Sequence, residues 1–254
     1  LLPGMPCARS RRYSVATLTG TAEYDAVVLA TDLPGLRALV AASPRLGSPA
    51  WRSQVAERPS APPFLVCRLW LDQPVRADRP AFLGTSGYPT LDNISVLERY
   101  EDQAAAWAAR TGGSVVELHA YALPDDAVLS VERDRLVAQL HQVYPETATA
   151  RIVDERSELR ADCPLFPPGD FTRRLTVTTP DPFLVVAGDH VRVDLPVALM
   201  ERAATSGLLA ANTLLSLWGL PGHVVWSVPN QGRIPLARHL LPPLPRTQPL
   251  SALG

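Results

Sequence analysis

The sequence contains no lysine, so all 24 of its basic residues are arginines. This absence excludes reactions that need a lysine Schiff base. Cysteine is also scarce: Cys7, Cys67 and Cys163 lie far apart and form neither a CxxC pair nor a cluster with histidine. Structural disulfides and a zinc site are therefore not expected, and the cysteine pattern suits a reducing compartment such as the cytoplasm.

Long hydrophobic runs and an excess of one charge are missing as well. No apolar stretch reaches the roughly 18 residues that a membrane-spanning helix needs. The net charge of −1 gives no reason to expect a nucleic acid as partner. The first residues, 1–4, show neither an initiator methionine nor the pattern of a signal peptide. We interpret this start as an internal cut in a longer chain.

The residues that are present indicate a globular protein. The 254 residues are 46% hydrophobic and 19% charged, which is sufficient for the core of one large domain or two modest ones. The 26 prolines are predicted to stiffen loops and an irregular, proline-rich tail at 221–254.

Hydrophobic periodicity predicts an alternation of strands and helices. The expected strands are 12–19, 24–31, 64–71, 82–85, 93–97, 114–122, 151–159 and 183–187, and the expected helices are 33–41, 50–57, 101–110, 131–144 and 196–217. The short apolar run 24–31 is typical of a strand that is buried on both faces. A similar run at 183–189 follows about 150 residues later, which predicts one nucleotide-binding layer interrupted by an inserted domain. Within the insertion, 61–159 reads as a sheet with helices on one side.

The segment that follows the last predicted strand carries the most specific pattern. The strand leads to Gly188, where the missing side chain lets the backbone approach a ligand. Asp189 can accept hydrogen bonds from the hydroxyls of a sugar or of ribitol. Pro196 is expected to begin a helix, whose free N–H groups and positive dipole end favour a negatively charged ligand such as a reduced flavin. The alternative is a plain strand–turn–helix in which Asp189 is a solvated cap.

Small residues follow on the same predicted helix. Ala203, Gly207 and Ala211 recur at every fourth position, so they share one face. This stripe would allow close packing against a sheet or a cofactor.

Together these residues resemble a known superfamily. The run LVVAGDHVRVDLPVALMERAATSGLLAAN, from Leu184, resembles the C-terminal FAD-binding segment of the amine oxidase and phytoene desaturase superfamily. The run YDAVVLATDLPGLRAL, from Tyr24, resembles the strand, loop and helix by which such chains return to their FAD-binding domain. Within the superfamily, 91–124, 159–169 and 225–233 resemble the bacterial isorenieratene synthase group. Those flavoenzymes aromatise the β-ionone rings of carotenes with a methyl shift.

The resemblance implies a fold and a cofactor. The fold would be α/β with an α+β insert: a partial FAD-binding, Rossmann-like layer interrupted by a mixed-sheet substrate domain with helices. Four segments follow, namely a return segment at 1–60, a substrate-binding domain at 61–170, the C-terminal FAD-binding strand and helix at 171–220, and the tail at 221–254. FAD would contact Ala30, Thr31, Gly188, Asp189, Pro196, Val197, Ala198 and Met200. The substrate would be an apolar carotene, which implies a cytoplasmic protein with peripheral contact to the membrane that holds the carotene.

The sequence departs from the superfamily in one respect. Such proteins open with a strand and a G-x-G-x-x-G turn that binds the FAD pyrophosphate, and no such motif occurs here. We therefore expect the N-terminal FAD-binding half, with its βαβ unit, to be missing from this chain. The chain alone should then be colourless and inactive, and a stoichiometric flavin spectrum would contradict this.

One strand carries candidate catalytic groups. On 114–122, Val115, Glu117, His119 and Tyr121 share a face. In the resembled fold a central sheet covers the substrate, so Glu117 or His119 could accept a proton. The preferred alternative is a polar face that is only hydrogen-bonded or solvated.

Two other functions remain open at this stage. An amine oxidase of the same fold usually has an aromatic cage and a lysine–water–flavin contact, and the absence of lysine argues against the second feature. A non-catalytic fragment or binding module is the other alternative, supported by the missing glycine-rich turn.

Overall fold

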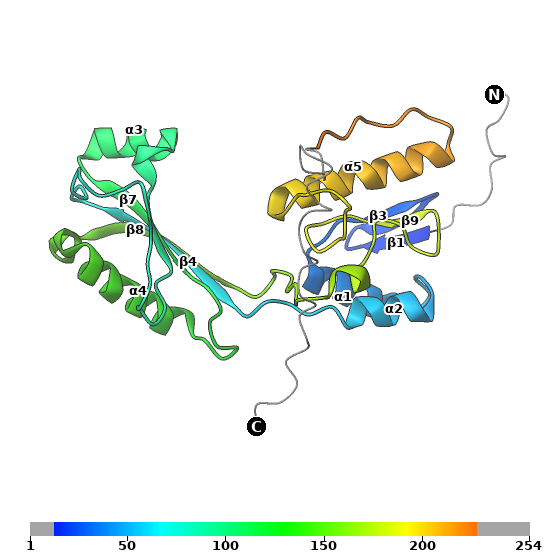
Figure 1. Cartoon of the computed structure of the whole chain (residues 1–254), viewed down its shortest axis with the longest axis horizontal. Coiled ribbons are helices and arrows are strands. Elements are labelled where there is room, and N and C mark those ends of the chain that lie inside the picture. Colours follow the sequence, from blue (N-terminus) through cyan, green and yellow to red (C-terminus); the bar gives the residue numbers. More distant parts are fainter. Residues whose placement is uncertain (1–12, 228–254) are drawn as a thin grey trace, which may run out of the picture. The chain divides into compact units, whose positions relative to one another are not determined.

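The computed structural model describes residues 13–227. These residues form two compact units: a sheet unit, Leu29–Leu175, and a terminal unit that combines the described residues up to Val28 with those from Thr176 onward (Figure 1). Each unit is described by itself below. Cys7, the start of the chain and the predicted tail from residue 228 on lie outside the described residues.

The sheet unit is built on five strands in the order β5-β6-β7-β4-β8. Their bounds are β4 Phe64–Leu71, β5 Phe82–Gly84, β6 Asn93–Val96, β7 Ser114–Ala120 and β8 Ile152–Arg160. Every pairing in this sheet is antiparallel, so the prediction of a mixed sheet is wrong. β4 lies between β7 and β8 and pairs with both.

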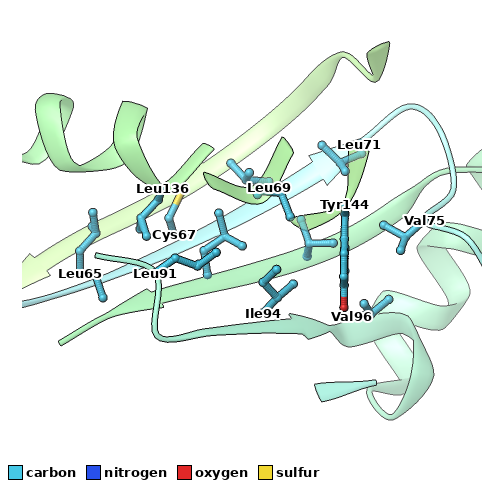
Figure 2. Close-up of a cluster of buried hydrophobic side chains, with 14 of the residues drawn as sticks. Leu65, Cys67, Leu69, Leu71, Val75, Leu91, Ile94, Val96, Leu136 and Tyr144 are labelled. Atoms are coloured by element: carbon cyan, nitrogen blue, oxygen red, sulfur yellow. The ribbon is translucent and has the colours of Figure 1, made fainter. Parts of the chain in front are cut away.

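One face of the sheet holds the main core. Burial alternates along β4, so that Leu65, Cys67, Leu69 and Leu71 are almost fully buried while the intervening side chains face the opposite side. Helix α4, Leu129–Val143, covers the buried face together with the 3₁₀ helix η2, Pro145–Thr149. Figure 2 shows this cluster, with the Tyr144 ring standing among the strand side chains. Burial raises the pKa of the Cys67 thiol to about 11, so this cysteine is a core residue rather than a reactive one.

The opposite face is covered only in part. Helix α3, Asp102–Thr111, packs Ala104 and Trp107 against Val115, Trp70 and the 3₁₀ helix η1, Leu97–Arg99. Since Val115 and Val116 point to opposite sides of the same strand, α3 and α4 lie on different faces of the sheet. The prediction of helices on one side is therefore wrong. The rest of this second face carries the polar side chains described below.

The chain enters and leaves the sheet through two paired segments. Ser60 bridges to Pro164, and the Ala61 and Leu165 amides donate to the carbonyls of Cys163 and Pro59. Beside them, helix α2 ends near the 3₁₀ helix η3, and Arg58 forms an ion pair with Asp170 at 3.0 Å. The remaining helices of the unit are α1 Leu33–Ala42, α2 Pro49–Ala56 and η3 Phe171–Arg173.

The terminal unit contains two small sheets and one long helix. A hairpin joins β1 Tyr13–Thr17 to β2 Gly20–Tyr24, and β3 Val27–Leu29 pairs with β9 Leu184–Val186. β2 was not predicted because its exposed residues show no hydrophobic alternation. The prediction of a strand at 24–31 buried on both faces is also wrong, since β3 has three residues and Val28 is 44% exposed. Its partner β9, in contrast, is fully buried.

Helix α5, Leu199–Leu217, follows β9. The sequence predicted its start at Pro196, but Pro196 lies in the bend before the helix and Ala198 takes the N-cap position. The stripe of Ala203, Gly207 and Ala211 is only half-buried, because the helix buries Thr205, Ser206, Ala210 and Leu214 instead. A methyl group added at Gly207 would meet no atom within 4 Å.

One ion pair of the sheet unit makes its stability depend on pH. Arg79 donates two hydrogen bonds of 2.8 Å to Glu146 and stacks over the Tyr144 ring, and this lowers the pKa of Glu146 from 4.5 to about 2. Because the pKa of Glu146 is lower in the folded than in the unfolded protein, the ion pair stabilises the fold at pH values above the unfolded pKa. This stabilisation is lost as the pH falls from 4.5 through 2. We expect Glu146→Gln to cost about 1–2 kcal/mol near neutral pH and progressively less in acid.

Urea unfolding of both proteins between pH 7 and pH 3 measures this difference. Asp78→Asn is the matched control, because the Arg76–Asp78 pair lies at the exposed surface, and it should change stability by less than about 0.5 kcal/mol at either pH. A Glu146→Gln cost that does not vary with pH would contradict the assignment.

Candidate functional site

The turn after β9 requires glycine. Gly188 has φ +150°, and a Cβ placed there would lie 2.5 Å from Cε1 of His190. The Gly188 amide donates to the Ser206 hydroxyl at 2.9 Å, and this hydroxyl lies 3.1 Å from the Gly188 carbonyl oxygen. The Ser206 side chain thus ties the backbone of Gly188 to α5.

The start of α5 is open. Arg202 donates to the carbonyls of Asp189 and Val197, which ties the loop to the first turns of the helix and leaves the Asp189 carboxylate partly exposed. Ala198 provides no side-chain cap, so the first N–H groups of the helix are not satisfied by a capping side chain. Among the predicted cofactor contacts, Pro196, Ala198 and Met200 are exposed and Val197 is half-buried.

His190 adds a feature that the sequence did not indicate. Its side chain is 3% exposed, and neither ring nitrogen has a hydrogen-bond partner within the described residues. The nearest charged group is the Asp189 carboxylate, 3.8 Å from Nδ1. A buried imidazole without partners is costly, so this side chain is a strong candidate for contact with a bound group.

The other two predicted cofactor contacts lie in the sheet unit. Ala30 and Thr31 are exposed between β3 and α1, and Asp32 caps α1 by accepting from the Gly35 amide at 2.7 Å. A Cβ at Gly35 would lie 2.6 Å from the Asp32 carboxylate, so glycine keeps this turn tight. These residues and the Gly188 turn are thus placed in separate units.

A chain of hydrogen bonds crosses the second face of the sheet. Arg68 on β4 donates from Nε at 2.8 Å to Oε2 of Glu117, its register partner on β7. Oε1 of Glu117 lies 2.9 Å from Nε2 of His119, and Nδ1 of His119 lies 2.5 Å from the Tyr121 hydroxyl. The hydrogen bonds from His119 and Arg68 lower the pKa of Glu117, against the opposing effect of its burial.

Two members of this chain, Arg68 and Glu117, line a recess. The recess has a volume of about 350 Å³ and an apolar floor of Phe64, Val66 and Trp70, and its other lining residues are charged: Arg68, Glu117, Arg156, Glu158, Arg160 and Asp162. The sequence predicted that Glu117, His119 and Tyr121 share a face, and they do. It missed Arg68, for which the only signal was an arginine within an otherwise apolar strand.

The sequence matches a known protein family. The model of flavin-containing amine oxidoreductases matches residues 8–215. The chain belongs to this family. Its cofactor is FAD, as the flavin-binding segment of the sequence predicted.

Curated relatives narrow the resemblance within the flavin-containing amine oxidoreductases. The chain is 60% identical over 220 residues to a carotenoid phi-ring synthase of Streptomyces griseus, which covers 87% of this chain and 43% of that protein. It is 37% identical over 210 residues to a carotenoid phi-ring synthase of Chlorobaculum tepidum, covering 82% of this chain and 32% of that protein. The chain thus spans less than half the length of these curated relatives.

A solved structure supports the fold of this family. An oxidoreductase from Methanosarcina mazei superposes with a TM-score of 0.55 at 16% identity, over 75% of this chain and 43% of that one. The likeness shows a shared fold only. Between residues 13 and 227, no helix is both long and apolar enough to cross a membrane.

Two features of the terminal unit suit the FAD of this family. Within the described residues, the buried ring nitrogens of His190 have no hydrogen-bond partner, and this ring lies beside the Gly188 backbone, where a Cβ would be 2.5 Å from it. The donor set at the start of α5 consists of helix N–H groups, which suit an anionic ring or phosphate.

Proposed function

We propose that this chain is part of an FAD-dependent oxidoreductase that oxidises the β-ionone rings of carotenes to aromatic rings with migration of a methyl group. The observation that carries the proposal is the 60% identity to a carotenoid phi-ring synthase across 87% of the chain. Because the match covers 220 of the 254 residues, it includes the Gly188 segment and most of the sheet unit, so a change of substrate class is not expected.

The terminal unit is proposed to hold one side of the cofactor. Gly188 would let the backbone approach FAD, Asp189 would bind its ribitol hydroxyls, and the open start of α5 would face its negative end, with Pro196, Val197, Ala198 and Met200 around it. Ala30 and Thr31 stay predicted contacts of FAD. Bound FAD supplies a hydride acceptor.

The sheet unit is proposed to hold the substrate. The apolar floor of the recess suits a hydrocarbon ring, and its 350 Å³ is on the order of a ring-sized pocket rather than one for a whole carotene. The polar chain beside it, which includes Glu117 and His119, would take the protons that the ring loses. Since a carotene resides in the bilayer, the protein would act at the membrane surface.

Expression from the complete gene in a host that makes β-carotene tests the function. We expect new carotenoids with aromatic rings, identified by their shifted absorbance and by the lower mass that follows from loss of ring hydrogens. The empty vector is the control. Unchanged β-carotene in cells that contain the flavin-loaded protein would overturn the proposal.

A second candidate, an amine oxidase, predicts a different outcome. Oxidation of amines by the purified protein, with no change in carotenoids, would support it. Nothing in the recess favours it, because the floor residues Phe64, Val66 and Trp70 lie on one sheet face rather than forming an enclosing aromatic cage.

A further inference from the structure

The four members of the hydrogen-bonded chain on the sheet differ in exposure. The side chains of Glu117 and His119 are only 16% and 22% exposed, and both are engaged on either side. Tyr121 is 50% exposed and stands at the outer end. Of the two groups in this chain that do not line the recess, His119 and Tyr121, it is the more exposed.

The direction of the hydrogen bonds follows from the charge on Glu117. Arg68 donates to Oε2 from Nε at 2.8 Å, and its Nη2 forms an ion pair with the same oxygen at 2.7 Å. An ionised carboxylate can only accept, so a neutral His119 carries its hydrogen on Nε2 and donates it to Oε1. Nδ1 is then an acceptor, and the Tyr121 hydroxyl donates to it.

This order of groups matches a known way of activating a hydroxyl. A carboxylate that orients an imidazole, which in turn accepts from a hydroxyl, turns the hydroxyl oxygen into a proton acceptor or nucleophile. Here the hydroxyl belongs to a phenol. Arg68 stands behind the carboxylate and keeps it ionised.

The backbone holds Tyr121 in place. Its amide donates to the Asp92 carboxylate at 2.6 Å, and the next residue, Ala122, has φ +51°, which is uncommon for a residue other than glycine. Strained backbone of this kind persists where the surroundings fix it, and it concentrates at functional sites.

We propose that Tyr121 is a catalytic residue that removes the ring proton of the substrate, with His119, Glu117 and Arg68 as positioning residues. The inference rests on the proposed carotenoid function. It takes the place of Glu117 or His119 as the proposed proton acceptor, because Glu117 already accepts from Arg68 and both ring nitrogens of His119 are hydrogen-bonded.

The groups already named account for the proton and for the electron pair of the C–H bond that breaks. Once a hydride has left the ring for the flavin oxidant, a C–H bond on the neighbouring ring carbon breaks and its electron pair forms the ring C=C bond. The proton goes to the Tyr121 oxygen while the phenol proton passes to Nδ1 of His119. The resulting imidazolium lies 2.9 Å from the Glu117 carboxylate and later releases its proton to water.

Tyr121→Phe in the FAD-loaded protein from the complete gene tests the proposal. With β-carotene in lipid vesicles, we expect kcat for ring aromatisation to fall about 100-fold, the typical contribution of a general base. KM, the flavin content and the melting temperature should stay unchanged, because the ring of tyrosine is retained. Tyr100→Phe is the matched control, since Tyr100 is similarly exposed, at 55%, outside the hydrogen-bonded chain, and it should keep the wild-type kcat.

The outcomes distinguish the role of Tyr121 from the proposed carotenoid function. A Tyr121→Phe protein with the kcat of the wild type would overturn the assignment of Tyr121 while leaving the carotenoid function intact. A fall in kcat accompanied by loss of flavin or of melting temperature would point to a structural role and would also overturn it. A wild-type protein that oxidises no carotene would overturn the proposed function and this inference with it. His119→Gln should lower kcat as well, with the same KM, because it removes the acceptor of the phenol proton.

Discussion

Replacing Gly188 with alanine is expected to destabilise the terminal unit by about 3 kcal/mol, which combines the cost of a strained backbone with that of overpacking. The glycine has φ +150°, which L-residues rarely adopt, and the added methyl carbon would lie 2.5 Å from the His190 ring. The ring has little room to move, since His190 is 3% exposed. In the flavin-loaded protein from the complete gene, we also expect less FAD to be retained per chain.

Urea unfolding of the variant, followed by circular dichroism, measures the effect. Gly207→Ala is the control on the same helix, since a methyl group meets no atom there and should stabilise by about 0.5–1 kcal/mol. The double variant Gly188→Ala/His190→Ala separates the two causes, because it removes the ring but keeps the backbone strain. A loss below about 1 kcal/mol for Gly188→Ala would contradict the tight turn that the strain and overpacking costs imply.

Replacing Asp170 with alanine is expected to destabilise the sheet unit by about 3–5 kcal/mol, the cost of leaving a buried charge without its partner. The Asp170 side chain is 5% exposed and pairs with Arg58 at 3.0 Å, with Arg173 at 3.5 Å and with Arg174 at 3.8 Å. Arg58 and Arg174 are largely buried, so water cannot replace the lost carboxylate. The same pair closes the point where the chain enters and leaves the sheet.

Thermal unfolding of the protein compares this variant with two others. Arg173→Ala removes an exposed partner, so it should change stability by less than about 0.5 kcal/mol. Asp170→Asn keeps the acceptor oxygen but loses the charge, and we expect an intermediate loss. If Arg173→Ala and Asp170→Ala cost the same, the buried pair with Arg58 does not hold these segments together.

The positions of the elements could be predicted from the sequence more reliably than their partners. Strand β4 was predicted at its observed bounds, 64–71, because its alternation and the flanking Pro62 and Pro63 are local signals. The antiparallel pairing of β7 and β8 with β4 was not predicted. The order of strands in a sheet depends on contacts between residues that are far apart in the chain. The hydrophobic periodicity of each strand does not reveal these contacts.

The two candidate sites also differ in how much of each could be predicted from the sequence. Gly188, Asp189 and the helix that follows are adjacent in sequence, so their pattern alone predicts a flavin-binding segment. The helix α5 begins at Leu199 rather than at Pro196, because proline suits a helix start but does not fix one. The burial of His190 had no sequence signal.

The sequence by itself determined the family and the cofactor, because a strand, a glycine turn and a helix start are encoded by consecutive residues. It also determined which side chains share the outer face of β7, since strand residues alternate between two faces. Only the tertiary structure decided how those side chains act together. Arg68 lies 49 residues from Glu117, and the cross-strand register that joins them is set by burial of the opposite face under α4. That register pairs Glu117 with Arg68, while Tyr121 lies at the exposed end of the chain.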